Sequence, residues 1–129
     1  MDKDFTRWHV TKQRIQDNAI RGFYREGEVC WCALGLNIGV ETDGKGKSYT
    51  RPVLILKAFG QNAFLGIPVT SKIKTGKFYY DLNLGDGVPR QAMLSQIRFM
   101  DAKRLNRKIT AIAPAELLKI KQAAREIIS

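Results

Sequence analysis

Short runs of alternating apolar and other residues begin at residue 27, and this period of two is typical of β-strands. The pattern predicts strands over residues 29–34, 53–59, 63–69, 77–84 and 92–100, with a last short one over 109–112. The first run is apolar on both faces. Gly60-Gln61-Asn62 predicts a hairpin between the second and third strands. Several short strands joined by hairpins predict a mainly β protein, a small antiparallel β-barrel.

Helical spacing replaces this pattern at the two ends of the chain. Trp8, Ile15 and Ala19 would share one helical face, so we expect an N-terminal helical arm over residues 1–26. Residues 27–129 would then form the barrel domain together with a C-terminal helix.

The C-terminal helix has a clear start signal and one apolar stripe. Before this helix, Asp101 is placed to cap a separate short turn that runs through Arg104. Pro114 fits the first turn of the terminal helix, where its missing N–H is not needed. The stripe that this helix would pack on the barrel consists of Leu117, Ile120, Ala124 and Ile127.

The net charge of +10 is high for 129 residues. Residues 44–80 carry seven Lys or Arg side chains and no Asp or Glu, and a second basic cluster covers residues 98–108. Clustered positive charge attracts polyanions and speeds their encounter, which favours nucleic acid as a ligand. A solvated basic surface that keeps the protein soluble is the alternative.

Several classes of protein are disfavoured by what the sequence lacks. It has no apolar run long enough to span a membrane and no signal-peptide core, so we expect a cytoplasmic protein. Cys30 and Cys32 are too close along a strand for an unstrained disulfide, and we expect both to be reduced. His9 is the only histidine and the acids are scattered, so neither a metal site nor a cofactor is expected.

Arg51 and Thr70 are the residues most suited to phosphate chemistry. Arg51 opens one predicted strand and Thr70 follows the next, so both would lie at strand ends. A guanidinium fork and a hydroxyl can together hold a phosphodiester, and on RNA the ribose 2′-hydroxyl would be the nucleophile. Arg51 would then stabilise charge on the phosphorus rather than act as a base, because its pKa lies above about 12. By spacing alone, however, the two residues are better explained as strand ends without a catalytic role.

A resemblance gives this pair more weight. The segments GEVCWCALG, NIGVE, RPVLIL, IPVTS, LSQIRFMD and KRLNRKI occur in this order over residues 27–109, and together they resemble the MazF/PemK family of toxin endoribonucleases. The resemblance implies a CcdB/MazF-type barrel (an Src-homology-like barrel), a homodimer, metal-independent cleavage of single-stranded RNA, and a cognate antitoxin protein that blocks the RNA groove.

The same resemblance assigns site residues. It implies that Arg51 and Thr70 are catalytic. The substrate-binding residues that it implies are Glu41, Lys45, Lys47, Ser71, Ser95, Gln96 and Arg98. Ser95 stands where many members carry an acid proposed as the general base, so a carboxylate base here would have to come from elsewhere, with Glu41 as the candidate by motif.

Two alternatives to an endoribonuclease stay open. One is a non-enzymatic toxin of the same fold that binds DNA gyrase through its terminal helix. The other is a barrel that binds nucleic acid without cleaving it, which the serine at position 95 would permit. The Arg51/Thr70 pair favours the nuclease, since gyrase binding does not need it.

Overall fold

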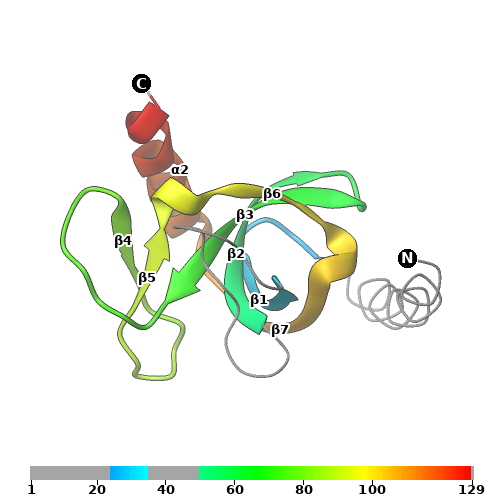
Figure 1. The fold of residues 1–129 in the computed structure, drawn as a ribbon, viewed down its shortest axis with the longest axis horizontal. Coiled ribbons are helices and arrows are strands. Elements are labelled where there is room, and N and C mark those ends of the chain that lie inside the picture. The colour runs from blue at the N-terminus through cyan, green and yellow to red at the C-terminus, as the bar shows by residue number, and fades with distance from the viewer. Residues whose placement is uncertain (1–23, 35–49, 129) are drawn as a thin grey trace.

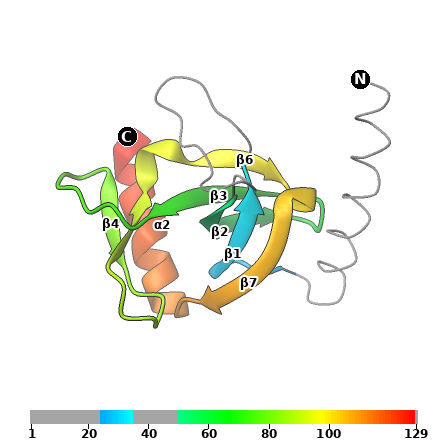
Figure 2. The same cartoon turned by 60° about the horizontal axis from the view of Figure 1, so that its bottom comes forward.

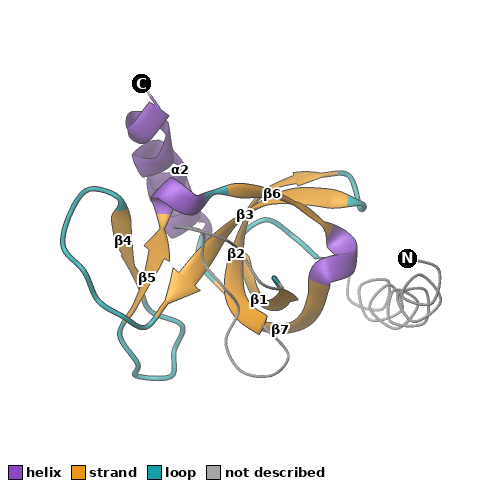
Figure 3. Ribbon diagram, in the orientation of Figure 1, coloured by secondary structure: helices purple, strands orange, loops and turns teal. Residues whose placement is uncertain are grey.

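Seven antiparallel strands and one long helix make up most of residues 24–34 and 50–128, the part of the chain that this computed structural model describes (Figure 1). The strands are β1 (Glu28–Ala33), β2 (Thr50–Phe59), β3 (Ala63–Thr70), β4 (Tyr79–Leu82), β5 (Arg90–Met93), β6 (Arg98–Asp101) and β7 (Leu105–Ala111). The helix is α2 (Pro114–Ile128), and two short 3₁₀ turns, η1 (Leu94–Gln96) and η2 (Ala102–Arg104), flank β6 (Figure 3). No helix within these residues is long and apolar enough to cross a membrane.

The strands pair in the order β4-β5-β3-β2-β1-β7, and β6 pairs with the other half of β3. The predicted class, a small antiparallel β protein with a C-terminal helix, is confirmed. Within the described residues the ladder is open, because β4 and β7 are its two ends. The arm expected over residues 1–26 lies outside the described residues up to residue 23.

The sheet has an apolar layer on each face. One layer gathers around Leu54, Ile67 and Val69 and is covered by Ile120 of α2. The other gathers around Val53, Phe64 and Met100 and includes Cys30, Cys32 and Leu34. β1 contributes to both layers through Val29 and the cysteines, which confirms the prediction that this strand is apolar on both faces.

Both cysteines are free and buried, as the sequence indicated. Burial raises the pKa of the Cys30 thiol to about 12, and the nearby Glu28 carboxylate adds to the shift. Burial also raises the pKa of Cys32. Neither thiol is therefore ionised at neutral pH.

The prediction of one strand over residues 92–100 is wrong. Val69 lies opposite Ala92, and if that register continued, Gly66 would lie opposite Ser95; it lies opposite Arg98 instead. The three residues of η1 are thus removed from the ladder, and the chain moves from one half of β3 to the other. Leu94 stabilises this turn, because its side chain is buried and its N–H donates to the Phe78 carbonyl at 2.8 Å.

Other boundaries differ less. β7 begins at Leu105, four residues before the predicted start, and β4 is shorter than the predicted 77–84. The predicted cap is confirmed, since Asp101 Oδ1 accepts from the Lys103 N–H at 2.9 Å. The hairpin at Gly60 is confirmed as well, with a positive φ of 70° at the glycine.

The helix α2 covers the β4, β5 and η1 side of the sheet, away from the β2–β3 turn (Figures 1 and 2). Its predicted stripe faces the core, since Ile120 and Ala124 are buried and Leu117 and Ile127 pack against the same layer. Two polar contacts fix it from either side: Tyr80 Oη donates to Glu116 Oε2 at 2.9 Å, and Lys121 Nζ donates to Glu26 Oε1 at 3.1 Å.

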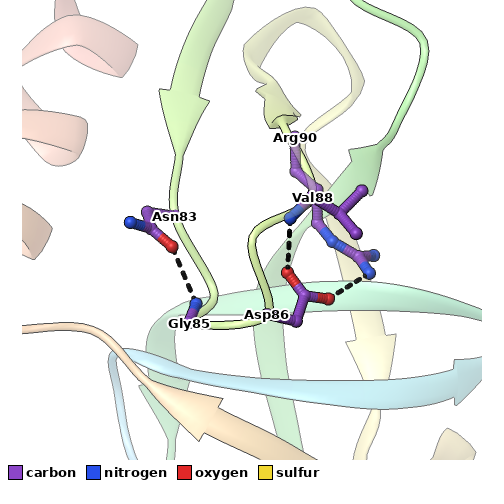
Figure 4. A network of polar contacts seen from close by, with 5 residues as sticks. All are labelled: Asn83, Gly85, Asp86, Val88 and Arg90. Carbon is purple, nitrogen blue, oxygen red and sulfur yellow. Dashed lines mark hydrogen bonds and ion pairs between the residues drawn. The ribbon is translucent and has the colours of Figure 1, made fainter.

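The β4–β5 turn is braced by its own side chains (Figure 4). Asp86 Oδ1 accepts from the Val88 N–H at 3.1 Å, and Oδ2 accepts from Arg90 Nη2 at 2.7 Å. These contacts, the backbone N–H first, hold the pKa of Asp86 below its usual value. The Asn83 side chain accepts from the Gly85 N–H in the same turn. The brace sets the start of β5, whose second residue is Gln91.

Gln91 joins three segments through one buried amide. Its Oε1 accepts from the Lys74 N–H at 2.9 Å, and its Nε2 donates to the Lys74 carbonyl at 2.8 Å and to Asp81 Oδ1 at 3.0 Å. Gln91 also lies opposite Thr70, the last residue of β3. The connection after Thr70 is therefore held against β5 by a side chain rather than by the sheet.

We predict that Gln91→Ala lowers the free energy of unfolding by about 1–3 kcal/mol, because it leaves half-buried backbone groups of Lys74 without partners. Urea unfolding measures the loss, and hydrogen exchange should show a faster Lys74 amide. Gln61→Ala, in the exposed β2–β3 turn, is the matched control and should change neither quantity. Unchanged exchange at Lys74 in the Gln91 variant would contradict the assigned contact.

Candidate functional site

Arg51 and Thr70 lie at the same end of two paired strands. Arg51 is the second residue of β2 and Thr70 the last of β3. Val53 of β2 pairs with Pro68 of β3. Because the strands are antiparallel, a step of two residues from this pair toward the strand end sets Arg51 opposite Thr70. Directly opposed residues project from the same face of a sheet. The structure therefore brings the two residues together, as the sequence analysis expected.

The row continues on both sides of this pair. Arg51 lies opposite Cys32 of β1, and Thr70 lies opposite Gln91 of β5. Four strands thus contribute one residue each to a single line across the sheet. A site built on paired strands holds its side chains more rigidly than a site on loops.

Both side chains are largely withdrawn from solvent. Arg51 is 8% exposed and Thr70 is 6% exposed. Arg51 Nη1 donates to the Val69 carbonyl at 3.3 Å, which points the guanidinium toward β3. An arginine stays charged when buried, and charge acts more strongly where water is scarce. The arrangement is a fixed positive donor beside a hydroxyl.

The Thr70 hydroxyl is oriented from the opposite direction. Its Oγ1 accepts from the Lys72 N–H at 3.1 Å, which closes a local turn after the strand. Because the oxygen already accepts one bond, the hydroxyl hydrogen is the part suited to binding an anionic oxygen. Ser71 follows immediately and is exposed, so it lies at the same strand end.

The β3–β4 connection carries positive charge away from this end and apolar surface further along, where the Phe78 carbonyl accepts from the Leu94 N–H of η1. Lys72, Lys74 and Lys77 are exposed along it, and Phe78 is 41% exposed. Lys77 Nζ lies 5.6 Å from the centre of the Phe78 ring, within cation–π range. Exposed lysines beside an exposed ring suit a single-stranded nucleic acid, whose phosphates pair with the former and whose bases stack on the latter.

A pocket lies near the first residues of β2, on the opposite face of the sheet from Arg51. Its volume is about 360 Å³, and it is lined by Trp31, Thr50, Asn106 and Arg107, which come from β1, β2 and β7. Thr50 pairs with Ala33, so it projects from the opposite face to its neighbour Arg51. The pocket is therefore near the Arg51 end of β2 but on the other face.

The remaining expected site residues are divided. Arg98 lies opposite Gly66, on the same face as Thr70 and four residues away along β3, about 13 Å. Ser95 and Gln96 belong to η1, and Ser95 lines a groove against α2 rather than the Arg51 side. Glu41, Lys45 and Lys47 lie outside the described residues.

Sequence reasoning missed Gln91, and it counted the lysines of the connection around it only as part of the basic stretch 44–80. The sequence does indicate that the connection is basic, since three lysines, Lys72, Lys74 and Lys77, follow shortly after the P-V-T segment. Gln91 has no such signal, because its importance comes from lying opposite Thr70 on the neighbouring strand, which is distant in sequence. Within the described residues no three His, Cys, Asp or Glu side chains are grouped closely enough to hold a metal ion.

Comparison with known structures shows the fold. The chain resembles MazF of Deinococcus radiodurans with a TM-score of 0.66 and 23% identity, over 81% of this chain and 96% of that one. It also resembles a mycobacterial endoribonuclease in complex with its cognate antitoxin, with a TM-score of 0.63 and 16% identity over 81% and 94%. A Deinococcus radiodurans MazE–MazF complex gives 0.62 and 17%, over 82% and 95%.

Sequence comparison supplies the family. No curated protein gives a significant match to the chain. The model of the PemK-like, MazF-like toxins of type II toxin–antitoxin systems matches residues 25–128, which is most of the chain and includes both Arg51 and Thr70. The protein therefore belongs to the PemK-like, MazF-like toxin family of type II toxin–antitoxin systems.

Proposed function

We propose that this toxin is an endoribonuclease that cleaves single-stranded RNA without a metal ion, and that a cognate antitoxin neutralises it. The observation that carries the proposal is the buried Arg51 guanidinium opposite the Thr70 hydroxyl, at a strand end flanked by exposed lysines. Family membership supports the toxin role, and related folds include an endoribonuclease bound to its antitoxin.

In the proposed reaction the ribose 2′-hydroxyl attacks the adjacent phosphorus. The new P–O bond closes a 2′,3′-cyclic phosphate, the bond to the 5′-oxygen breaks, and the 2′-hydroxyl proton passes to solvent water. Arg51 binds non-bridging oxygens as negative charge grows on the five-coordinate phosphorus, and can protonate the leaving 5′-oxygen, after which a proton from solvent restores the guanidinium. Thr70 donates one further hydrogen bond. The products carry a cyclic phosphate and a 5′-hydroxyl.

RNA binding in this proposal uses the face that holds both residues. Arg98 shares that face about 13 Å from Thr70, a distance that a polymer spans but a mononucleotide does not. Lys72 and Lys74, just after Thr70, would bind further phosphates, and Phe78, further along the same connection, would stack on a base. Substrate selectivity for unpaired RNA follows, because stacking on a side chain requires a base that is free of a duplex.

The proposal includes a homodimer, but the apolar stripe of α2 is not available for it. The α2 stripe is covered within one chain, since Ile120 is fully buried and Ala124 nearly so. Exposed apolar residues available for self-association include Val88 of the β4–β5 turn and Leu118 on the outer side of α2. Sedimentation of the purified protein would measure the oligomeric state.

We predict that Arg51→Ala lowers the cleavage rate by about 10²–10³, the usual effect of losing one donor to a developing oxyanion. Thr70→Ala should cost less, since it removes a neutral donor, and Arg51→Lys should restore little, because a point charge does not reproduce the guanidinium fork. Single-turnover cleavage of a labelled RNA measures all three. Lys119→Ala, exposed on α2, is the control, and circular dichroism verifies the fold.

We further predict full cleavage activity in excess chelator, and none on an RNA with a single deoxyribose at the cleaved position, since the nucleophile is then missing. End mapping by mass spectrometry should find the cyclic phosphate. The same RNA with the deoxyribose moved several nucleotides away is the control and should be cut normally. Activity lost in chelator and restored by magnesium would overturn the mechanism.

A further inference from the structure

The pocket near the first residues of β2 is separate from the Arg51/Thr70 pair and has side chains of its own. Its volume of about 360 Å³ is in the range of sites that hold small ligands. Three neighbouring strands line it, with Trp31 from β1, Thr50 from β2, and Asn106 and Arg107 from β7. β1 pairs with both of the other strands (Figure 2). The pocket is therefore built on the sheet, which holds its side chains in place.

An irregularity in β7 places two of these side chains beside one tryptophan. The register is set by two flanking pairs, Cys30–Lys108 and Cys32–Leu105. Between them β1 has one residue, Trp31, whereas β7 has two, Asn106 and Arg107. Two residues opposite one define a β-bulge, which redirects side chains and often lies next to a functional site. Successive residues of a regular strand point to opposite faces, so without the bulge only one of Asn106 and Arg107 would face the pocket.

The lining side chains supply the contacts by which proteins hold a nucleotide. The indole of Trp31, which is half-buried, offers a flat apolar surface on which a base can stack. The amide of Asn106 presents a donor and an acceptor side by side, which matches the edge of a base. The guanidinium of Arg107 matches a phosphate. Both β7 side chains are exposed and so accessible to a ligand.

Arg107 is available to an anion, unlike two of its basic neighbours. Lys108 forms an ion pair with Glu28, with 3.1 Å between Nζ and Oε2. Arg104, just before β7, donates from Nη1 to the Ala33 carbonyl at 3.0 Å. The guanidinium of Arg107 makes no hydrogen bond or ion pair with another residue in the part of the chain that the structure describes. The bulge therefore places a positive charge that can bind a phosphate beside the stacking surface.

The pocket adjoins the proposed cleavage site along β2. Thr50 lines the pocket and Arg51 follows it directly, so their Cα atoms are about 3.8 Å apart although the two side chains point to opposite faces. An RNA strand that crosses this end of β2 places a phosphate at Arg51 and brings a nearby base to the pocket. We propose that the pocket binds one base of the RNA substrate near the cleaved phosphate, and that Asn106 selects this base. The inference rests on the proposed RNA cleavage and adds the residues that read the sequence.

The tryptophan of the pocket serves as the probe. Trp8→Phe leaves Trp31 as the one tryptophan of the full chain, and a base stacked on it quenches its fluorescence. With Arg51→Ala added to protect the RNA, this chain is titrated with single-stranded RNAs of about six nucleotides: oligo(A), oligo(C), oligo(U) and alternating GU. We expect one of the four to bind about tenfold more tightly than the others, because a matched base edge discriminates on this order. AMP, CMP, GMP and UMP should quench only at far higher concentrations, since each lacks the neighbouring phosphates.

The two β7 side chains should have different effects, because base contacts specify and phosphate contacts position. Asn106→Ala should remove the preference among the four RNAs, by weakening the preferred one about tenfold. Arg107→Ala should weaken all four equally and reduce the slope of log affinity against log salt by about 0.7, the value for one phosphate contact on a single strand. Asn62→Ala, in the β2–β3 turn, and Arg25→Ala, before β1, are the matched exposed controls and should change neither quantity.

Cleavage provides a separate measurement. Sequencing of the cut sites in a long mixed RNA should show that Asn106→Ala, in a chain that keeps Arg51, relaxes the preference at one position only. Base-selective quenching by a chain that cuts no RNA would overturn the proposed cleavage and support the pocket. RNA that binds without quenching Trp31, or a preference that Asn106→Ala leaves intact, would overturn the pocket even if the chain cleaves RNA. Mononucleotides that quench at the same concentrations as the longer RNAs would assign the pocket to a free nucleotide instead.

Discussion

The sharing of β3 among three neighbours is the constraint on which the other features depend. β2 pairs along most of its length, β6 pairs with residues 63–66, and β5 pairs with Val69 and Thr70. Gly66 lies where these ladders meet, and a Cβ there would be only 2.6 Å from Val53 Cγ1 and 3.0 Å from Met100 Sδ. Because Gly66 has no side chain, the side chains of Val53 on β2 and Met100 on β6 can both pack against β3 at this point. The two ends of β3 then serve different surfaces, with Thr70 at one and the exposed, stacked rings of Phe59 and Phe99 at the other.

The pairing change on β3 also creates the groove that Ser95 lines against α2. Three residues have to leave the ladder between β5 and β6, and they form η1 beside α2. Had the chain continued as one strand, β6 would have the register of β5, and Ser95 would lie within the sheet. The 3₁₀ turn instead exposes Ser95 and turns Leu94 into the core. One shift of register thus separates the phosphate-binding row from this groove.

Local signals explain what the sequence predicted well. The Asp101 cap, Pro114, the Gly60 turn and the first three strands each depend on neighbours in the chain, which periodicity and turn chemistry report. The opposition of Arg51 and Thr70 followed from the hairpin between β2 and β3, because a tight turn fixes the register of the two strands.

Contacts between distant segments explain the errors. The break at η1 depends on which half of β3 each segment joins, and no local pattern carries that information. Ser95 and Arg98 are three residues apart in sequence, yet they serve different surfaces because of the same break. Gln91 lies just outside the strand predicted over residues 92–100, and its position opposite Thr70 on β5 is what brings it to Lys74 and Asp81.

The burial of the two cysteines has a practical consequence. A thiol reacts as its thiolate, and with a pKa of about 12 for Cys30 and a raised pKa for Cys32 almost none is present at neutral pH. The chain contains no other cysteine. A single cysteine introduced at an exposed position such as Gln122 of α2 would therefore accept one fluorophore or spin label per chain, with the native pair left in place to pack the core. Two such introduced cysteines, one on each face, would allow distance measurements between the two faces.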